Sequence, residues 1–168
     1  MKIGNCPTMG KYTEEISKKY SLDIVRNRSA AEVLYNLSAG NFDIGLIGRK
    51  AEKAGFIDYE KRLKDVGYTL IYREKSTIDY RQLGAITVHT YLPENIVKNN
   101  FPEFRNIIYH QSLEKSLKEG KINLISWDDW DDRFNLLIPI DEFGNKIEKF
   151  RTPILYSKNE IIKEMSLA

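Results

Sequence analysis

The chain has 168 residues, of which 42% are hydrophobic and 30% charged, and its formal net charge is only +2. This composition is typical of a folded globular protein and excludes an intrinsically disordered chain. No basic block alternates with aromatic residues, which argues against direct binding of nucleic acid. Every apolar run falls short of the roughly 18–20 residues that span a bilayer, so we expect no membrane insertion.

Cys6 is the single cysteine, so a disulfide within the chain is excluded and a reducing compartment is favoured. The first residues lack a signal-peptide pattern, and we therefore expect a cytoplasmic location. A strand is nevertheless predicted to start at residue 2, as if a signal peptide or another N-terminal domain had been removed. A removed signal peptide would place the protein outside the cytoplasm. One cysteine and two separated histidines do not suit zinc, and we expect no metal and no cofactor.

The first part of the chain has the pattern of a βαβαβ unit. The last of its strands is a nearly unbroken apolar run, as in parallel strands that are buried on both faces. Ser29 and Glu32 match a capping box that opens the second helix, and Gly40 ends that helix. The predicted elements alternate strand, helix, strand, helix, strand over residues 2–5, 11–20, 22–25, 29–40 and 42–47.

A second βαβαβ unit repeats this plan. Pro93 stands at the start of its first helix, and Gly120 ends its second helix as Gly40 does in the first unit. Its elements are predicted over residues 85–88, 93–101, 107–109, 112–119 and 122–126. The fold class expected is therefore α/β, with two βαβαβ lobes joined by two crossing segments.

The remaining segments connect and close the two units. Tyr59, Leu63 and Val66 share one face of a predicted short helix. Strands are predicted over 68–72, 134–140 and 150–156, followed by a terminal helix over 158–166. We expect the first lobe to comprise residues 1–72 with 141–168, and the second lobe to comprise residues 73–140.

With this arrangement the chain resembles a compact type II periplasmic-binding-protein-like domain. The resemblance covers nearly the whole chain and implies a two-lobed fold with a small-molecule ligand in the cleft between the lobes. It is carried by the segments Gly4–Thr8, Gly40–Arg49, Tyr68–Tyr72, Gly84–Val88, Ser112–Glu114 and Gly120–Asn123. Effector domains of bacterial helix-turn-helix regulators are similar in fold and are closer to this chain in length.

Candidate ligand-binding residues follow the strands, because open α/β sheets bind ligands beyond the carboxyl ends of their strands. In the first lobe these are Asn5, Cys6, Thr8 and Gly10, then Gly48 and Arg49. Free N–H groups at a helix start favour an anion, and a guanidinium suits a carboxylate or phosphate. The alternatives are a capped loop without a ligand, and a surface arginine paired with an acid such as Glu52.

In the second lobe the equivalent candidates are Thr87, His89 and Thr90, then Ser126, Trp127 and Asp128. A carboxylate here could pair with an amine, and an indole could cover a cation or a ring. With Arg49 opposite, the cleft would suit an amino-acid-like zwitterion. The alternatives are a loop histidine without a partner and an acidic first turn of a helix.

The sequence thus predicts a solute-binding or sensory domain for a polar ligand with a carboxylate or other anionic group. An enzyme of the lyase or dehydratase type on the same scaffold, and the sensory domain of a helix-turn-helix regulator, remain alternatives. No catalytic residue is assigned, because a dyad of Cys6 and His89 rests on one cysteine and one imidazole without geometry. The partner expected is a small molecule, and a homodimer stays open.

Overall fold

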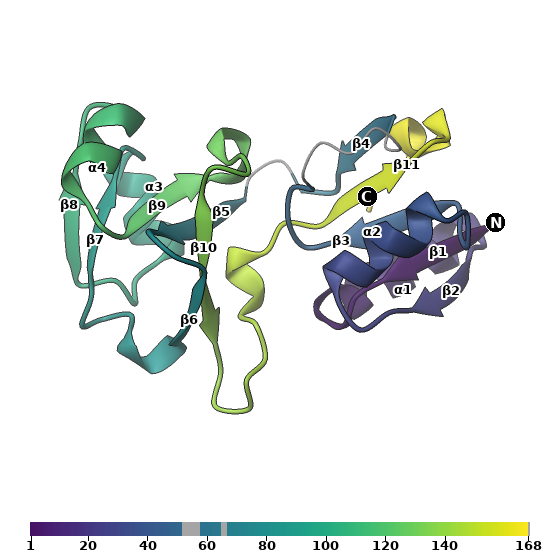
Figure 1. The fold of residues 1–168 in the computed structure, drawn as a ribbon, viewed down its shortest axis with the longest axis horizontal. Helices are drawn as coiled ribbons and strands as arrows, with labels where there is room; N and C mark the ends of the chain where they lie inside the picture. Colours follow the sequence, from purple (N-terminus) through teal and green to yellow (C-terminus); the bar gives the residue numbers. More distant parts are fainter. Residues whose placement is uncertain (52–57, 65–66, 168) are drawn as a thin grey trace. The chain divides into compact units, whose positions relative to one another are not determined.

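The computed structural model describes residues 1–51, 58–64 and 67–167. The chain folds into two compact units, Met1–Asp65 with Thr152–Ala168, and Val66–Arg151 (Figure 1). Each unit has its own mixed β-sheet and its own buried core. The predicted α/β class with two lobes is confirmed.

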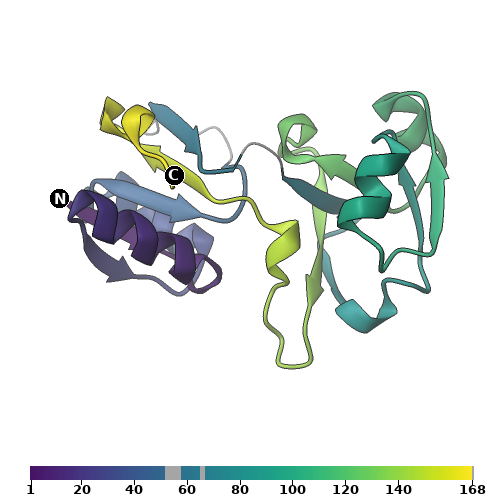
Figure 2. The same ribbon diagram turned by 180° about the vertical axis from the view of Figure 1, so that it is seen from behind.

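The sheet of the first unit has the strand order β2-β1-β3-β11-β4. Strands β1, β2 and β3 are parallel, and β11 runs antiparallel between β3 and β4. Helices α1 (Gly10–Tyr20) and α2 (Ala30–Ser38) cover opposite faces of this sheet (Figures 1 and 2). The strands are β1 (Lys2–Asn5), β2 (Asp23–Arg26), β3 (Ile44–Ile47), β4 (Tyr59–Arg62) and β11 (Ile154–Ser157).

Local signals in the sequence explain the ends of α2. The Ser29 side chain accepts a hydrogen bond from the Glu32 backbone N–H, which caps the helix start. Gly40 has a φ of 78°, a conformation that glycine adopts without the steric cost of a Cβ. The chain then turns, and Phe42 packs over Gly4 in the core of the unit.

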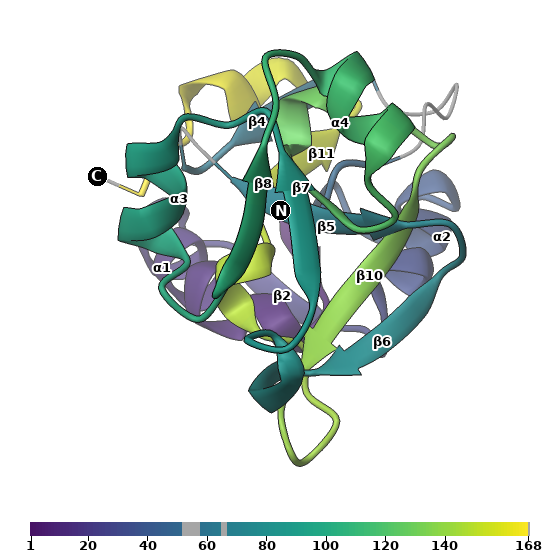
Figure 3. The same cartoon turned by 90° about the vertical axis from the view of Figure 1, so that its left-hand side faces the viewer.

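The sheet of the second unit has the strand order β6-β10-β5-β9-β7-β8. Strand β5 runs antiparallel to both of its neighbours, and all the other neighbouring pairs are parallel. Helices α3 (Glu94–Asn100) and α4 (Leu113–Glu119) lie on opposite faces of this sheet (Figure 3). The strands are β5 (Tyr68–Tyr72), β6 (Ser76–Asp79), β7 (Thr87–Thr90), β8 (Asn106–Tyr109), β9 (Asn123–Ser126) and β10 (Asn135–Ile140).

A glycine follows the second helix in both units, but the reason for the glycine differs between them. Gly120 has an ordinary φ of −104°, but a Cβ at this position would lie 2.3 Å from Cγ of His89. The ring of His89 on β7 therefore requires glycine here. The helix therefore ends at the predicted residue, Gly120. Glycine is required there by close packing against His89 and not by the backbone conformation.

Several elements differ from the prediction. The short helix expected through Tyr59 and Leu63 is wrong, because residues Tyr59–Arg62 form strand β4 and pair with β11; Val66 lies outside the described residues. Strand β6 was not predicted at all. Strand β7 begins two residues later than expected. A 3-10 helix at Glu148–Phe150 delays β11 to Ile154, and the terminal helix is also of the 3-10 type, at Glu160–Glu164.

In the part of the chain that the structure describes, no helix combines the length and the apolar character that crossing a membrane requires.

Candidate functional site

The carboxyl ends of β1 and β3 meet at one edge of the first sheet, as the parallel arrangement requires. Asn5 ends β1 and lies opposite Leu46 in the register of β1 and β3. The loop from Cys6 to Gly10 and the segment Gly48–Arg49 therefore start from neighbouring strands. This edge brings together the predicted residues of the first lobe, and Asn5 and Cys6 are buried within it.

The loop after β1 leads directly into a helix start that no side chain caps. Cys6 precedes a 3-10 helix at Pro7–Met9, and Gly10 then begins α1; neither Cys6 nor Met9 makes a side-chain cap hydrogen bond. The Cys6 thiol lies 3.4 Å from Oγ1 of Thr8. Backbone N–H groups at a helix start, together with the helix dipole, favour a negative charge.

The segment after β3 places a cation at the same edge. The Gly48 carbonyl accepts a hydrogen bond from the Thr152 backbone N–H, at 3.0 Å. Arg49 is half-buried, and its Nη1 donates to the Lys50 carbonyl at 3.3 Å. The expected alternative partner, Glu52, lies outside the described residues.

Thr152 is a residue of this edge that the sequence did not reveal. Its side chain is 1% exposed, and its Oγ1 has no hydrogen-bond partner among the described residues. A buried hydroxyl without a partner is costly, and most such groups in proteins are satisfied. In the sequence Thr152 falls within a predicted strand, and nothing in that pattern singles it out.

In the second unit, polar groups at the carboxyl ends of β7 and β9 form hydrogen bonds with one another. The Tyr91 hydroxyl accepts a hydrogen bond from the Ser126 backbone N–H at 3.1 Å and donates one to Oδ2 of Asp129. Burial, followed by the hydrogen bond to Asp129, raises the pKa of Tyr91 above its ordinary value. Ser126 is among the predicted ligand residues, whereas Tyr91, which it contacts, and Asp129, which Tyr91 contacts, are not.

Trp127 and Asp128 have different environments, although they are neighbours in a 3-10 helix. The Trp127 side chain is completely buried, contacts the ring of Trp130, and donates from Nε1 to the Phe150 carbonyl at 3.4 Å. Asp128 is exposed, and its backbone N–H donates to Oγ of Ser126. The acidic first turn thus has the capping geometry that the alternative interpretation described.

The predicted ligand residues Thr87, His89 and Thr90 all lie within strand β7 and not in the loop that follows it. Thr87 is exposed at the first residue of β7 and lies far along the strand from its carboxyl end. The Thr90 hydroxyl is buried and donates to the Leu124 carbonyl at 2.8 Å, which ties β7 to β9. His89 points toward α4, where Nδ1 lies 2.8 Å from Nε2 of His110.

Two cavities lie within single units, away from these carboxyl edges. One of about 460 Å³ adjoins the start of β3 in the first unit, between Gly40, Asp43 and Lys158. One of about 350 Å³ adjoins the start of β9 in the second unit. Among the described residues, no group of three or more His, Cys, Asp or Glu side chains is placed to hold a metal ion.

No protein-family model and no curated protein matches this sequence. Solved structures do resemble it over most of its length. A phosphate transport receptor from Vibrio cholerae has a TM-score of 0.39 and 13% identity, covering 98% of this chain and 89% of the receptor. The reduced OxyR regulatory domain from Pseudomonas aeruginosa has a TM-score of 0.40 and 11% identity, covering 96% and 89%.

A third similar structure is the periplasmic VFT2 domain of BvgS from Bordetella pertussis. Its TM-score is 0.38 at 9% identity, covering 94% of this chain and 80% of that domain. These proteins are of the periplasmic-binding-protein-like class that the sequence resembles. At these identities the likeness concerns the fold alone.

Proposed function

We propose that this chain is a small-molecule binding domain of the solute-binding or sensory kind. The carboxyl edge of the first sheet would hold the carboxylate or other anionic group of its ligand. The observation that carries this proposal is the buried Thr152 hydroxyl, which has no partner among the described residues. It belongs to a residue whose backbone N–H donates to the Gly48 carbonyl. A ligand oxygen at this position would satisfy that hydroxyl.

The other groups at this edge suit a negative charge. The uncapped N–H groups at the start of α1 supply donors and the positive end of the helix dipole. Arg49 supplies a guanidinium, whose planar geometry matches a carboxylate or phosphate. A hydroxyl, backbone N–H groups and a cation at one sheet edge form a common arrangement for holding an anion by direct hydrogen bonds.

Catalysis has less support than binding. The Cys6 thiol contacts the Thr8 hydroxyl, and the two histidines bond to each other. An acid/base mechanism needs a poised group next to a nucleophile or a water, and the described contacts pair these groups in other ways. The sensory and solute-binding roles share the same ligand site, so one binding experiment tests both.

The experiment is a thermal-shift screen with phosphate, sulfate, succinate and L-glutamate on the wild-type chain and on Thr152→Val. Binding to the folded state raises the melting temperature by linkage, so at least one of these anions should stabilise the wild type. Without added anion, Thr152→Val should be more stable by about 1 kcal/mol, because it removes an unsatisfied buried hydroxyl. With the anion, the variant should bind about tenfold more weakly.

The Arg49→Gln variant should lose affinity for the same anion, whereas Lys18→Gln, at the far end of α1, should keep it. A wild type that none of the four anions stabilises would contradict the proposal. Equal anion affinity in wild type, Thr152→Val and Arg49→Gln would contradict it as well. A loss of stability in Thr152→Val would show that the hydroxyl already has a partner, and the proposal would then lose its main support.

A further inference from the structure

The cavity of about 350 Å³ in the second unit combines cationic and apolar side chains in its lining. It opens where β5 ends and where β9 and β10 begin, at the opposite edge of the sheet from Ser126. Its volume is within the range of small-molecule sites. The residues that line it are Ile71, Tyr72, Arg73, Leu117, Gly120, Lys121, Asn123, Arg133, Phe134 and Asn135.

Two arginine–aromatic pairs, Arg73 with Tyr72 and Arg133 with Phe134, adjoin the end of the antiparallel ladder of β5 and β10. The Arg73 guanidinium lies 5.3 Å from the ring centroid of Tyr72, and that of Arg133 lies 5.1 Å from the ring of Phe134. Tyr72 is opposite Asn135, whose side-chain amide donates to the Arg73 carbonyl at 2.9 Å. Stacking on a ring restricts a guanidinium and holds its charge at the mouth of the cavity.

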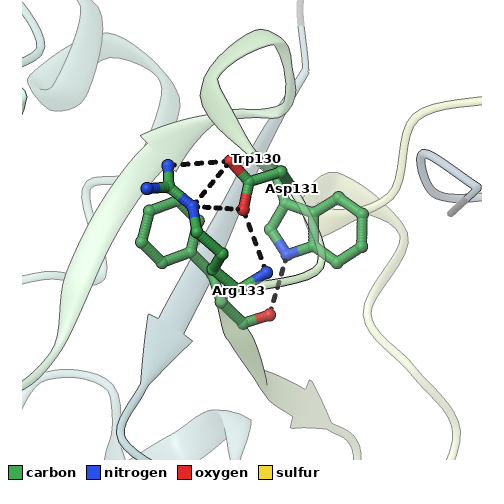
Figure 4. A network of polar contacts seen from close by, with 4 residues as sticks. Trp130, Asp131 and Arg133 are labelled. Atoms are coloured by element: carbon green, nitrogen blue, oxygen red, sulfur yellow. Dashed lines mark hydrogen bonds and ion pairs between the residues drawn. The ribbon is translucent and has the colours of Figure 1, made fainter. Parts of the chain in front are cut away.

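The charge of this lining is entirely positive. None of the described lining residues is acidic, and three of them are cations. Arg133 already forms a two-point pair with Asp131, at 2.8 and 3.0 Å, beside the indole of Trp130 (Figure 4). Within the described chain, neither Arg73 nor Lys121 forms an ion pair. Two exposed cations are therefore available to an anion.

The wall between these cations is apolar. Ile71 is buried, and Leu117 and Phe134 are half-buried. Asn123, which lies deeper, is already satisfied, because its carbonyl oxygen accepts from Ser116 and its amide donates to Gly120. An inorganic anion would meet the cations and leave the apolar wall in water. A molecule with both an anionic group and a flat apolar body would use both parts of the lining.

We propose that this cavity is a binding site for a small aromatic carboxylate, separate from the anion site of the first unit. The carboxylate would lie between Arg73 and Lys121, and the ring would cover Leu117 and Phe134. This arrangement does not depend on the proposed function, since no residue of the first unit takes part in it.

The test is calorimetric titration of the whole chain with benzoate, with benzamide as a neutral molecule of the same shape. Benzoate should bind the wild type, and benzamide should bind about tenfold more weakly because it cannot pair with the cations. Arg73→Gln and Lys121→Gln should each weaken benzoate binding about fivefold to tenfold. The matched control is Lys115→Gln on α4, which removes an exposed lysine outside the cavity and should bind benzoate as the wild type does.

Three results would overturn this site. They are no measurable binding of benzoate, equal binding of benzoate and benzamide, and unchanged affinity in both Arg73→Gln and Lys121→Gln. Arg49→Gln separates the two proposals. If it abolishes benzoate binding while Arg73→Gln does not, benzoate binds at the first unit; the second-unit site is then wrong, and the proposed function gains support.

Discussion

His89 and His110 share a hydrogen bond between their rings, with Nδ1 of His89 2.8 Å from Nε2 of His110. The rings are nearly parallel, with centroids 5.1 Å apart. His89 lies on β7, and His110 directly follows the neighbouring strand β8. One ring nitrogen must donate while the other accepts, so this bond requires that at least one imidazole be neutral. Glu119, at the end of α4, lies 3.6 Å from Nδ1 of His110.

This pair predicts a loss of stability on acidification. Burial, and then the charge of His110, lower the pKa of His89 below its ordinary value of 6.5, while Glu119 acts in the opposite direction. The unfolded chain therefore binds a proton at His89 at higher pH than the folded chain does. Stability from this group is present above pH 6.5 and falls as the pH drops below it.

The measurement is the urea midpoint of the wild type and of His89→Gln from about pH 8 to about pH 5. The wild type should lose stability below the ordinary histidine pKa, and the difference from His89→Gln should shrink there. Glu119→Gln removes the charge that raises the pKa of His89, so its loss on acidification should be steeper than in the wild type. Parallel curves for wild type and His89→Gln would contradict this assignment.

Gly4 and Gly10 predict opposite results for the same substitution. A Cβ at Gly4 would lie 2.2 Å from Cζ of buried Phe42, whereas a Cβ at Gly10 meets no atom within 4 Å. Gly4→Ala should cost about 1–3 kcal/mol of unfolding free energy through overpacking. Gly10→Ala, at the first residue of α1, should be neutral or stabilise by up to about 1 kcal/mol. Thermal denaturation of the two variants checks this, and equal melting temperatures would contradict it.

The second helix of each unit begins with a serine cap, so removing either cap should cost a similar amount of stability. Ser29 accepts from the Glu32 N–H at 3.1 Å, and Ser112 accepts from the Lys115 N–H at 3.2 Å. Ser29→Ala and Ser112→Ala should each lower the free energy of unfolding by about 1 kcal/mol. Replacement by aspartate, which also caps, should restore most of the loss in chemical denaturation. A loss in only one unit would show that the two helix starts are not equivalent.

The sequence predicts the central strands and helices of both units because their signals are local. Buried parallel strands give apolar runs, and caps and glycines mark the helix ends, as Ser29 and Gly40 do. Strands β4 and β6 each lie at one edge of their sheet, and their sequences are largely polar. Their conformation comes from pairing with β11 and β10, which no local pattern contains.

The candidate site was predicted less completely than the fold. The rule that ligand loops follow the carboxyl ends of strands led to Asn5, Cys6 and Arg49 at one edge, and the structure places the three there. Thr152 comes to this edge through a contact between segments more than a hundred residues apart, Gly48 and Thr152. The basic cavity of the second unit likewise depends on tertiary packing, since Arg73 and Arg133 are sixty positions apart in the chain.

Trp127 and its neighbour Asp128 are both predicted ligand residues, but Trp127 is buried and Asp128 is exposed. The Trp127 side chain is 0% exposed, and its Nε1 donates to the Phe150 carbonyl. Trp127→Phe should lower the free energy of unfolding by about 1–3 kcal/mol, because it leaves a cavity and removes a buried hydrogen bond. Asp128→Asn should change it by less than about 0.5 kcal/mol.

Denaturant titration of the two variants measures this difference, and anion titration by the same thermal-shift assay measures binding. If Trp127 is a core residue, the folded Trp127→Phe protein should bind the stabilising anion with the affinity of the wild type. A variant with wild-type stability and weakened binding would instead make Trp127 part of a ligand site. Its complete burial beside Trp130, with Nε1 already bonded to the Phe150 carbonyl, argues for the first outcome, because this side chain has no polar group left for a ligand to satisfy.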